Sequence, residues 1–134
     1  MKSKDGQRDM GNQPLKGLAR FVAAYRNSKA GFRDAWSDEE AFRYEVVALV
    51  LSIPVAWFFA GSVFQWALLV ASVLLVVIVE VLNSAIENVV DRIGPERHEN
   101  ARKAKDMGSL AVLLACGFAG IIWVAAIWQS LWGS

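Results

Sequence analysis

Hydrophobic residues fill two long stretches of the chain, residues 46–79 and 107–134, in which no charged side chain occurs. A helix that crosses a bilayer needs about 20 predominantly apolar residues, whereas apolar runs of about 10–14 are more typical of buried helices in soluble proteins. The two stretches therefore predict an integral membrane protein. They argue against an ordinary soluble enzyme, a nucleic-acid-binding module and a disordered chain.

The first stretch is too long for one spanning helix, so it predicts two helices joined by a turn. Gly61 and Ser62 give the only turn signal within it. The polar segment that follows contains Gly94 and Pro95, which should break the helical course. We therefore expect an all-α membrane protein with three transmembrane helices, at about residues 42–60, 63–90 and 109–131, and a polar loop over residues 91–108.

The positive charges divide the predicted spans into two sides. All 14 Lys and Arg residues lie within residues 1–43 or 92–105. Such an excess of positive charge marks the cytoplasmic side of a membrane protein. The N-terminus and the 91–108 loop are therefore expected in the cytoplasm, and three spans then place the C-terminus on the opposite side. The net charge of +1 adds little, because it averages the polar ends over a neutral membrane core.

Residues 15–36 have a different pattern, in which apolar and basic side chains interleave at helical spacing. Leu18, Phe21 and Val22 belong to the apolar set, and Arg20 and Arg26 to the basic set. The pattern predicts an amphipathic surface helix that lies on an anionic membrane leaflet and is a candidate for substrate binding. Residues 1–14 are predicted to be a disordered tail, which leaves residues 15–134 as a single membrane-embedded domain.

A polar stripe interrupts the second predicted span. At about 100° per residue, five side chains share one face of this helix: Glu80, Asn83, Ser84, Glu87 and Asp91. A carboxylate at membrane depth is costly unless it is paired, protonated or bound to a cation. Because no Lys or Arg lies in a predicted span, we interpret Glu80 as a proton acceptor. Two plainer interpretations stay open: Glu80 as a protonated structural carboxyl, and Asn83 and Ser84 as contacts between helices.

The polar segment supplies charges of the opposite sign. It mixes basic and acidic side chains within a few helical turns: Arg92, Glu96, Arg97, His98, Glu99, Arg102, Lys103, Lys105 and Asp106. A polyanion such as a nucleoside triphosphate could bind here, and a solvated loop facing lipid headgroups is an equally good interpretation. The sequence contains no GxxxxGK[ST] or GxGxxG motif, so these phosphate-binding loops are absent from it.

The polar stripe and the segment after it resemble a known family. The sequence Glu80-Val-Leu-Asn83-Ser84-Ala-Ile-Glu87 continues through Asp91-Arg92-Ile-Gly94 and His98 to Ala104-Lys105-Asp106-Met107-Gly108-Ser109. This pattern closely resembles the prokaryotic diacylglycerol kinases. The similarity extends upstream through Gly31-Phe-Arg33 and Glu39-x-Ala41-Phe42-Arg43-x-Glu45 and covers roughly residues 17–131.

The resemblance implies a homotrimer of three-span subunits that transfers the γ-phosphoryl group of MgATP to the hydroxyl group of a membrane lipid, at sites shared between subunits. It implies Glu80 as the general base, Glu39 and Glu87 as Mg²⁺ ligands, and Asn83 and Asp91 as supporting residues. The residues that it implies for ATP are Arg20, Glu39, Glu87, Glu96, His98, Lys105 and Asp106. Those that it implies for the lipid are Arg20, Arg33, Trp36, Ala41, Phe42, Arg43, Glu45, Glu80, Ser109 and Trp123.

Two positions depart from the family pattern. Phe58, in the first predicted span, takes a place that the family often gives to Trp, and it is assigned no role. Asn27 stands where the family commonly has a Tyr that contacts the adenine, so no nucleotide contact is assigned to it.

We therefore expect an ATP-dependent diacylglycerol kinase of a bacterial cytoplasmic membrane that produces phosphatidic acid and binds no nucleic acid. An undecaprenol kinase of the same family is the nearest alternative. From other classes, a small proton-relay or transporter subunit is the main rival, since intramembrane carboxylates often serve there, and a non-enzymatic assembly protein is a third possibility.

Overall fold

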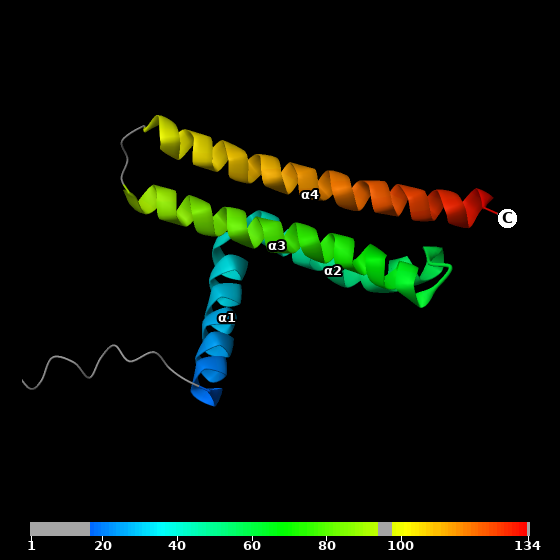
Figure 1. Ribbon diagram of the computed structural model, residues 1–134, viewed down its shortest axis with the longest axis horizontal. Helices are drawn as coiled ribbons and strands as arrows, with labels where there is room; N and C mark the ends of the chain where they lie inside the picture. The colour runs from blue at the N-terminus through cyan, green and yellow to red at the C-terminus, as the bar shows by residue number, and fades with distance from the viewer. Residues whose placement is uncertain (1–16, 94–97, 134) are drawn as a thin grey trace, which may run out of the picture. The chain divides into compact units, whose positions relative to one another are not determined.

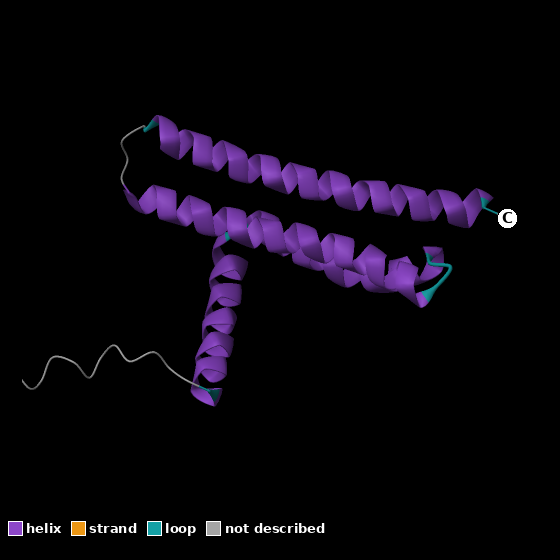
Figure 2. Ribbon diagram, in the orientation of Figure 1, coloured by secondary structure: helices purple, strands orange, loops and turns teal. Residues whose placement is uncertain are grey.

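All regular structure in the described residues, 17–93 and 98–133, is helical in the computed structural model (Figures 1 and 2). The helices are α1 (Leu18–Asp38), α2 (Glu40–Phe59), α3 (Val63–Ile93) and α4 (Glu99–Trp132). The last three are long and apolar enough to cross a membrane. These helices confirm the prediction of an all-α chain with three candidate spans. The predicted disordered tail lies outside the described residues.

The polar segment is more helical than its composition indicates. A loop was expected over residues 91–108, but α3 continues to Ile93 and α4 already begins at Glu99. This part of the prediction is wrong over most of its length. The physical reason is that charged side chains three or four positions apart can pair along a helix, as Arg102 does with Glu99 and Asp106.

The beginning of α1 also differs slightly from its predicted position. The helix was expected over residues 15–36 and is observed from Leu18 to Asp38. Gly17, directly before it, has a φ of 61°, a left-handed conformation that glycine adopts without a steric penalty. The backbone therefore changes direction at the residue where the helix begins.

The turn between α2 and α3 is built from its own side chains. Ser62 Oγ accepts a hydrogen bond from the backbone N–H of Gln65 at 3.2 Å, and Gln65 Oε1 accepts one from the backbone N–H of Gly61 at 2.8 Å. These reciprocal bonds resemble a capping box and satisfy donors that a helix start leaves free. The turn predicted from Gly61 and Ser62 is therefore observed, with Gln65 as the residue that closes it.

The chain divides into two units between Asp34 and Ala35. In the second unit α3 packs against both α2 and α4, and the three helices lie side by side with α3 antiparallel to the other two (Figure 1). One apolar cluster joins Ala56, Leu69 and Ala126, and another joins Val76, Ala115 and Ala119. Small alanines allow the close helix contacts that are typical of membrane proteins.

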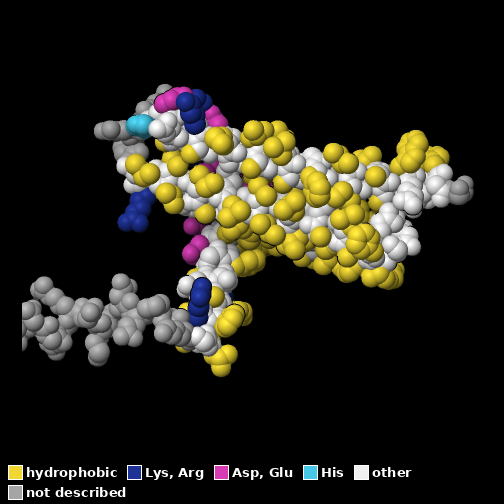
Figure 3. Space-filling view, viewed as in Figure 1, with side chains coloured by type: hydrophobic (Ala, Val, Ile, Leu, Met, Phe, Trp, Pro, Cys, Tyr) yellow, Lys and Arg dark blue, Asp and Glu magenta, His cyan; other side chains and the backbone are white. Residues whose placement is uncertain are grey.

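Charged and apolar side chains separate along this second unit. In the view of Figure 3, hydrophobic side chains cover most of the three helices, and the charged ones gather toward the end where α3 ends and α4 begins. The other end, at the turn between α2 and α3, has no Lys, Arg, Asp or Glu between residues 46 and 79. This distribution is typical of a membrane protein with one strongly charged side.

Candidate active site

The polar stripe of α3 faces the interior of the second unit. Glu80, Asn83 and Ser84 are buried, with exposed fractions of 7%, 9% and 7%. Ser84 accepts a hydrogen bond through its backbone carbonyl, from Asn88 Nδ2 at 2.9 Å. The inward placement follows from the helical period, since positions three and four apart lie on one face. A carboxyl group and a carboxamide are thus buried at the same level of the helix.

Three other carboxylates lie within electrostatic range of Glu80. Glu39 precedes the first residue of α2 and Glu87 lies two turns further along α3, and both interact electrostatically with Glu80. Glu45, on α2, does so as well. Within the described residues, no Lys, Arg or His forms an ion pair with Glu80. Acidic side chains from two separate stretches of the sequence, residues 39–45 and 80–87, therefore influence one another in the structure.

Two buried polar atoms of this site have no hydrogen-bond partner among the described residues, Glu45 Oε2 and Asn83 Oδ1. The other end of the Asn83 carboxamide does have one, since Nδ2 donates to Glu87 Oε1 at 3.4 Å. An unsatisfied buried polar atom is costly, and such atoms in native proteins often indicate a site that binds something else. The site therefore combines negative charge with unused hydrogen-bonding capacity.

One cation, Lys105, lies within electrostatic range of Glu87. Lys105 Nζ, on α4, forms an ion pair with Asp91 Oδ1, on α3, at 2.8 Å. Lys105 also interacts electrostatically with Glu87. The pair joins two helices across the segment between them, and it places a positive charge next to a carboxylate predicted to bind metal.

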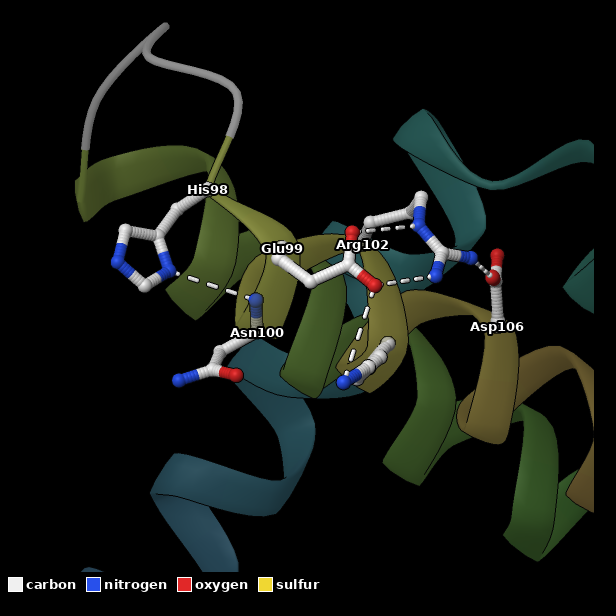
Figure 4. A network of polar contacts seen from close by, with 6 residues as sticks. His98, Glu99, Asn100, Arg102 and Asp106 are labelled. Atoms are coloured by element: carbon white, nitrogen blue, oxygen red, sulfur yellow. Dashed lines mark hydrogen bonds and ion pairs between the residues drawn. The ribbon is translucent and has the colours of Figure 1, made fainter.

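The first turns of α4 hold a separate network of charges (Figure 4). Arg102 forms ion pairs with Glu99, at 2.7 Å, and with Asp106. His98 caps the helix, because its Nδ1 accepts a hydrogen bond from the backbone N–H of Asn100 at 3.3 Å. Two residues predicted to face the nucleotide, His98 and Asp106, therefore make local contacts here. A third, Glu96, lies outside the described residues.

The residues predicted for the lipid are spread over several environments. Arg43 Nη1 donates to the backbone carbonyls of Trp36 and Ser37, at 2.9 and 3.2 Å, and so caps the last turn of α1. Phe42 is buried, while Ala41 and Ser109 are exposed. Arg20 and Arg33 belong to the first unit, so their place in the site stays a prediction.

Trp123 lies apart from the carboxylates. Its Nε1 donates to the backbone carbonyl of Leu69 at 3.3 Å, and its ring packs against the cluster of Ala56, Leu69 and Ala126. Leu69 precedes Glu80 by 11 positions of α3, which corresponds to about 16 Å along the helix axis. The structure therefore places Trp123 with the apolar packing of the bundle.

Gly108 is a site residue to which the sequence analysis gave no role. It is buried on α4, and a Cβ at this position would overlap Asn83 Oδ1. The only sequence signal is a glycine inside a long helical stretch, where glycine is unfavourable and usually has a packing or functional reason. Its neighbour in space is not readable from the sequence.

The carboxylates fit the needs of a phosphate-bound Mg²⁺ ion. Within the described ranges, no three His, Cys, Asp or Glu side chains are grouped so that they could hold a metal ion. Mg²⁺ at a phosphate site commonly uses only one or two carboxylates, with phosphate and water oxygens completing its shell. Glu39 and Glu87, which both interact electrostatically with Glu80, are the two carboxylates predicted to hold such an ion.

Comparison with known proteins identifies the family. The sequence model of the prokaryotic diacylglycerol kinases matches residues 26–127. The chain belongs to this family. It is 49% identical over 113 residues to a diacylglycerol kinase of Escherichia coli strain K12, a match that covers 84% of this chain and 93% of the relative. A diacylglycerol kinase of Pseudomonas aeruginosa is 43% identical over 121 residues, 88% of this chain and 98% of the relative.

A third relative, a diacylglycerol kinase of Haemophilus influenzae, is 42% identical over 107 residues, which cover 80% of this chain and 91% of the relative. The family membership confirms the resemblance seen in the residues and the prediction of a membrane-bound kinase enzyme. Together with the three long apolar helices, it identifies the chain as a multi-pass membrane protein with lipid kinase function.

Proposed function

We propose that this kinase transfers the γ-phosphoryl group of MgATP to the hydroxyl group of 1,2-diacylglycerol and so forms phosphatidic acid and ADP. The curated relatives that carry the name diacylglycerol kinase support this substrate. The observation that carries the chemistry is the burial of Glu80, 7% exposed, without an ion pair to any described cation. A buried, unpaired carboxylate is suited to accept a proton.

In the proposed reaction Glu80 is the general base. As the lipid hydroxyl oxygen forms its bond to the γ-phosphorus, the O–H bond breaks and the proton passes to the Glu80 carboxylate. The bond from the γ-phosphorus to the bridging β,γ-oxygen breaks at the same time, and its electron pair leaves with ADP. Phosphoryl transfer of this kind depends mainly on positioning and charge stabilisation, which the residues around Glu80 can provide.

Glu39 and Glu87 are the proposed Mg²⁺ ligands. These two carboxylates would hold the ion, which would supply positive charge to offset the charge of the phosphates. Asn83 donates to Glu87 and so restrains one of these carboxylates, and Asp91 holds Lys105 nearby. We propose that Lys105 contacts the phosphates, with Arg20, Glu96, His98 and Asp106 on the nucleotide side.

The position of the polar stripe along α3 supports a site that both a membrane lipid and a water-soluble nucleotide can reach. Counted from Val63 at about 1.5 Å per residue, Glu80 lies about 26 Å and Glu87 about 36 Å along the helix. The hydrocarbon core of a bilayer is about 30 Å thick. A lipid hydroxyl can thus reach Glu80 from the membrane, while MgATP can reach Glu87 from water.

We further propose that the charged end faces the cytoplasm of a bacterial inner membrane and that α1 lies on its surface. The lipid would be held by residues near the junction of α1 and α2 and by the start of the third span: Arg33, Trp36, Ala41, Phe42, Arg43, Glu45 and Ser109. Three copies would share their sites between neighbours. Cross-linking in intact membranes tests this arrangement, with a trimer as the expected largest product and a monomer alone as the contradictory one.

An assay with two lipids tests the proposed function directly. The purified full-length protein is given ATP, Mg²⁺ and either diacylglycerol or undecaprenol in mixed detergent micelles. We expect rapid, Mg²⁺-dependent formation of phosphatidic acid and much slower phosphorylation of the polyprenol. A strong preference for undecaprenol would assign the protein to the alternative lipid. Absence of ATP consumption with either lipid would contradict kinase function and favour a transporter or proton-relay role.

A further inference from the structure

Gly108 of α4 lies directly against the polar stripe of α3. A Cβ built on it would overlap Asn83 Oδ1 and would lie 3.2 Å from Asn83 Cγ. Both residues are buried, and interiors of this kind have little free volume. Any side chain at position 108 therefore requires Asn83 to move.

The two ends of the Asn83 carboxamide face different surroundings. Nδ2 donates to Glu87 Oε1 at 3.4 Å, and Oδ1, on the other side, is turned toward Gly108 and has no hydrogen-bond partner among the described residues. The reverse orientation would place an amide oxygen against the carboxylate of Glu87 with no proton between them. Glu87 thus fixes which end of the amide faces which helix, and Gly108 leaves room for the oxygen.

We propose that Gly108 is a positioning residue for Glu87 and acts through Asn83. The absence of a side chain on Gly108 leaves room for the carboxamide oxygen beside α4, and in this position the N–H donor orients the Glu87 carboxylate. This inference rests on the proposed function, because Glu87 matters to the reaction only as a ligand of the phosphate-bound Mg²⁺.

The effect of replacing Gly108 by alanine can be deduced from the atoms that the added methyl group would overlap. The atom closest to the added Cβ is the far end of a side chain, so a methyl group displaces the Asn83 carboxamide and leaves the backbone of both helices in place. The Gly108→Ala protein is therefore expected to fold. Its Glu87 loses a hydrogen-bond donor, and the loss of such supporting bonds typically weakens metal affinity by about 10–100-fold.

The dependence of activity on Mg²⁺ gives the first test. Gly108→Ala is compared with Gly117→Ala, a matched control on the same helix whose added Cβ would meet nothing within 4 Å. We expect Gly108→Ala to need about tenfold more Mg²⁺ for half-maximal activity, with an unchanged KM for diacylglycerol. Gly117→Ala should behave like the wild type. Equal Mg²⁺ requirements in the two variants would overturn the proposal.

A double-mutant cycle identifies Asn83 as the intermediary. In an Asn83→Ala background the two atoms that crowd the new Cβ at position 108 are gone, and the Cβ of residue 83, at 3.8 Å, makes an ordinary contact. Gly108→Ala should then change the Mg²⁺ requirement by less than about twofold. A loss of the same size in both backgrounds would contradict an effect through Asn83.

A measurement without nucleotide or metal tests the geometry by itself. In detergent-solubilised protein labelled with ¹⁵N-asparagine, the side-chain amide signal of Asn83 is identified by its loss in Asn83→Ala. We expect this signal to shift in Gly108→Ala and to stay unchanged in Gly117→Ala. An unshifted signal in Gly108→Ala would overturn the proposal.

These outcomes separate the inference from the proposed function. A wild-type protein that does not phosphorylate diacylglycerol would contradict the function, whereas the amide signal reports on Asn83 whether or not a reaction occurs. Should Gly108→Ala fail to fold, the Asn83→Ala/Gly108→Ala protein is still expected to fold as Asn83→Ala does. Its failure to do so would contradict the steric account.

Discussion

The two halves of the bundle formed by α2, α3 and α4 differ in what they bury. In the half near the turn between α2 and α3, Leu69 is completely buried between Ala56 and Ala126. Polar groups there have partners: Trp66 Nε1 donates to Ile53, and Trp123 Nε1 donates to Leu69. In the other half, Glu80 and Asn83 are buried instead.

The two halves differ in whether their buried polar side-chain atoms have hydrogen-bond partners. Within the described part of the chain, the buried side-chain atoms without a hydrogen-bond partner are Glu45 Oε2 and Asn83 Oδ1, and both belong to the polar half. A membrane offers such atoms no water, so leaving them without a partner costs stability. The apolar half therefore holds the helices together, and the polar half, which contains the proposed active site, gives up some stability through its unsatisfied atoms.

The largest effect is expected from a substitution in the polar half, Glu80→Gln. Glu80→Gln removes the proposed base while preserving the shape of the side chain, and general bases typically contribute about 10²–10⁴-fold to a rate. We expect kcat to fall within that range, with KM for ATP and for diacylglycerol nearly unchanged. Glu40→Gln, an exposed acid whose Oε1 accepts a hydrogen bond from Tyr44, is the control and should keep full activity.

The second-largest effect is expected from a substitution in the apolar half, and it concerns stability. Leu69→Ala leaves a cavity in the best-buried part of the bundle, and such changes cost about 2–5 kcal/mol. We expect a lower unfolding midpoint in detergent, with kcat of the folded fraction unchanged. Leu68→Ala, at a neighbouring and partly exposed position, should lose much less stability. A Leu69→Ala protein of unaltered stability but reduced kcat would contradict the division between the halves.

A smaller effect separates metal binding from proton transfer within the polar half. Glu87→Gln weakens a proposed Mg²⁺ ligand, so the Mg²⁺ concentration for half-maximal activity should rise by roughly tenfold or more. The activity at saturating Mg²⁺ should recover much more than that of Glu80→Gln. Titration of both variants with Mg²⁺ at fixed ATP checks this, and an unshifted Mg²⁺ requirement in Glu87→Gln would remove the residue from the metal site.

The smallest effect concerns Trp123, where the resemblance implies a lipid contact and the structure shows packing. Trp123→Phe loses the hydrogen bond to Leu69 and should destabilise the protein by about 0.5–1.5 kcal/mol. We expect KM for diacylglycerol to stay the same. The exposed Trp128→Phe is the control for stability. A raised KM in Trp123→Phe alone would assign this residue to the lipid pocket.

The helices and the polar stripe could be predicted from the sequence because both depend on local periodicity. Long apolar runs determine the spans, and the 3.6-residue period places Glu80, Asn83 and Ser84 on the same face. The extent of α4 was not predicted, since the charges of residues 99–106 suggest a loop. These charges instead pair along the helix, as those of Glu99 and Arg102 do.

The rest of the site depends on contacts between helices, which no local pattern contains. Gly108 and Asn83 are 25 positions apart, and only the packing of α4 on α3 brings them together. The position of Trp123 beside Leu69 has the same origin. Sequence reasoning therefore pointed to the polar stripe that the structure buries, but it missed Gly108, which makes room for Asn83, and the packing of Trp123 against Leu69.

The acidity of the acceptor alcohol gives the most direct test of Glu80 as a base. Wild-type protein and Glu80→Gln are assayed with diacylglycerol and with a fluorinated analogue whose hydroxyl group loses its proton more readily. A more acidic alcohol depends less on a base, so we predict that the defect of Glu80→Gln is markedly smaller with the analogue. An equal defect with both alcohols would show that Glu80 does not accept the proton and would contradict the proposed mechanism.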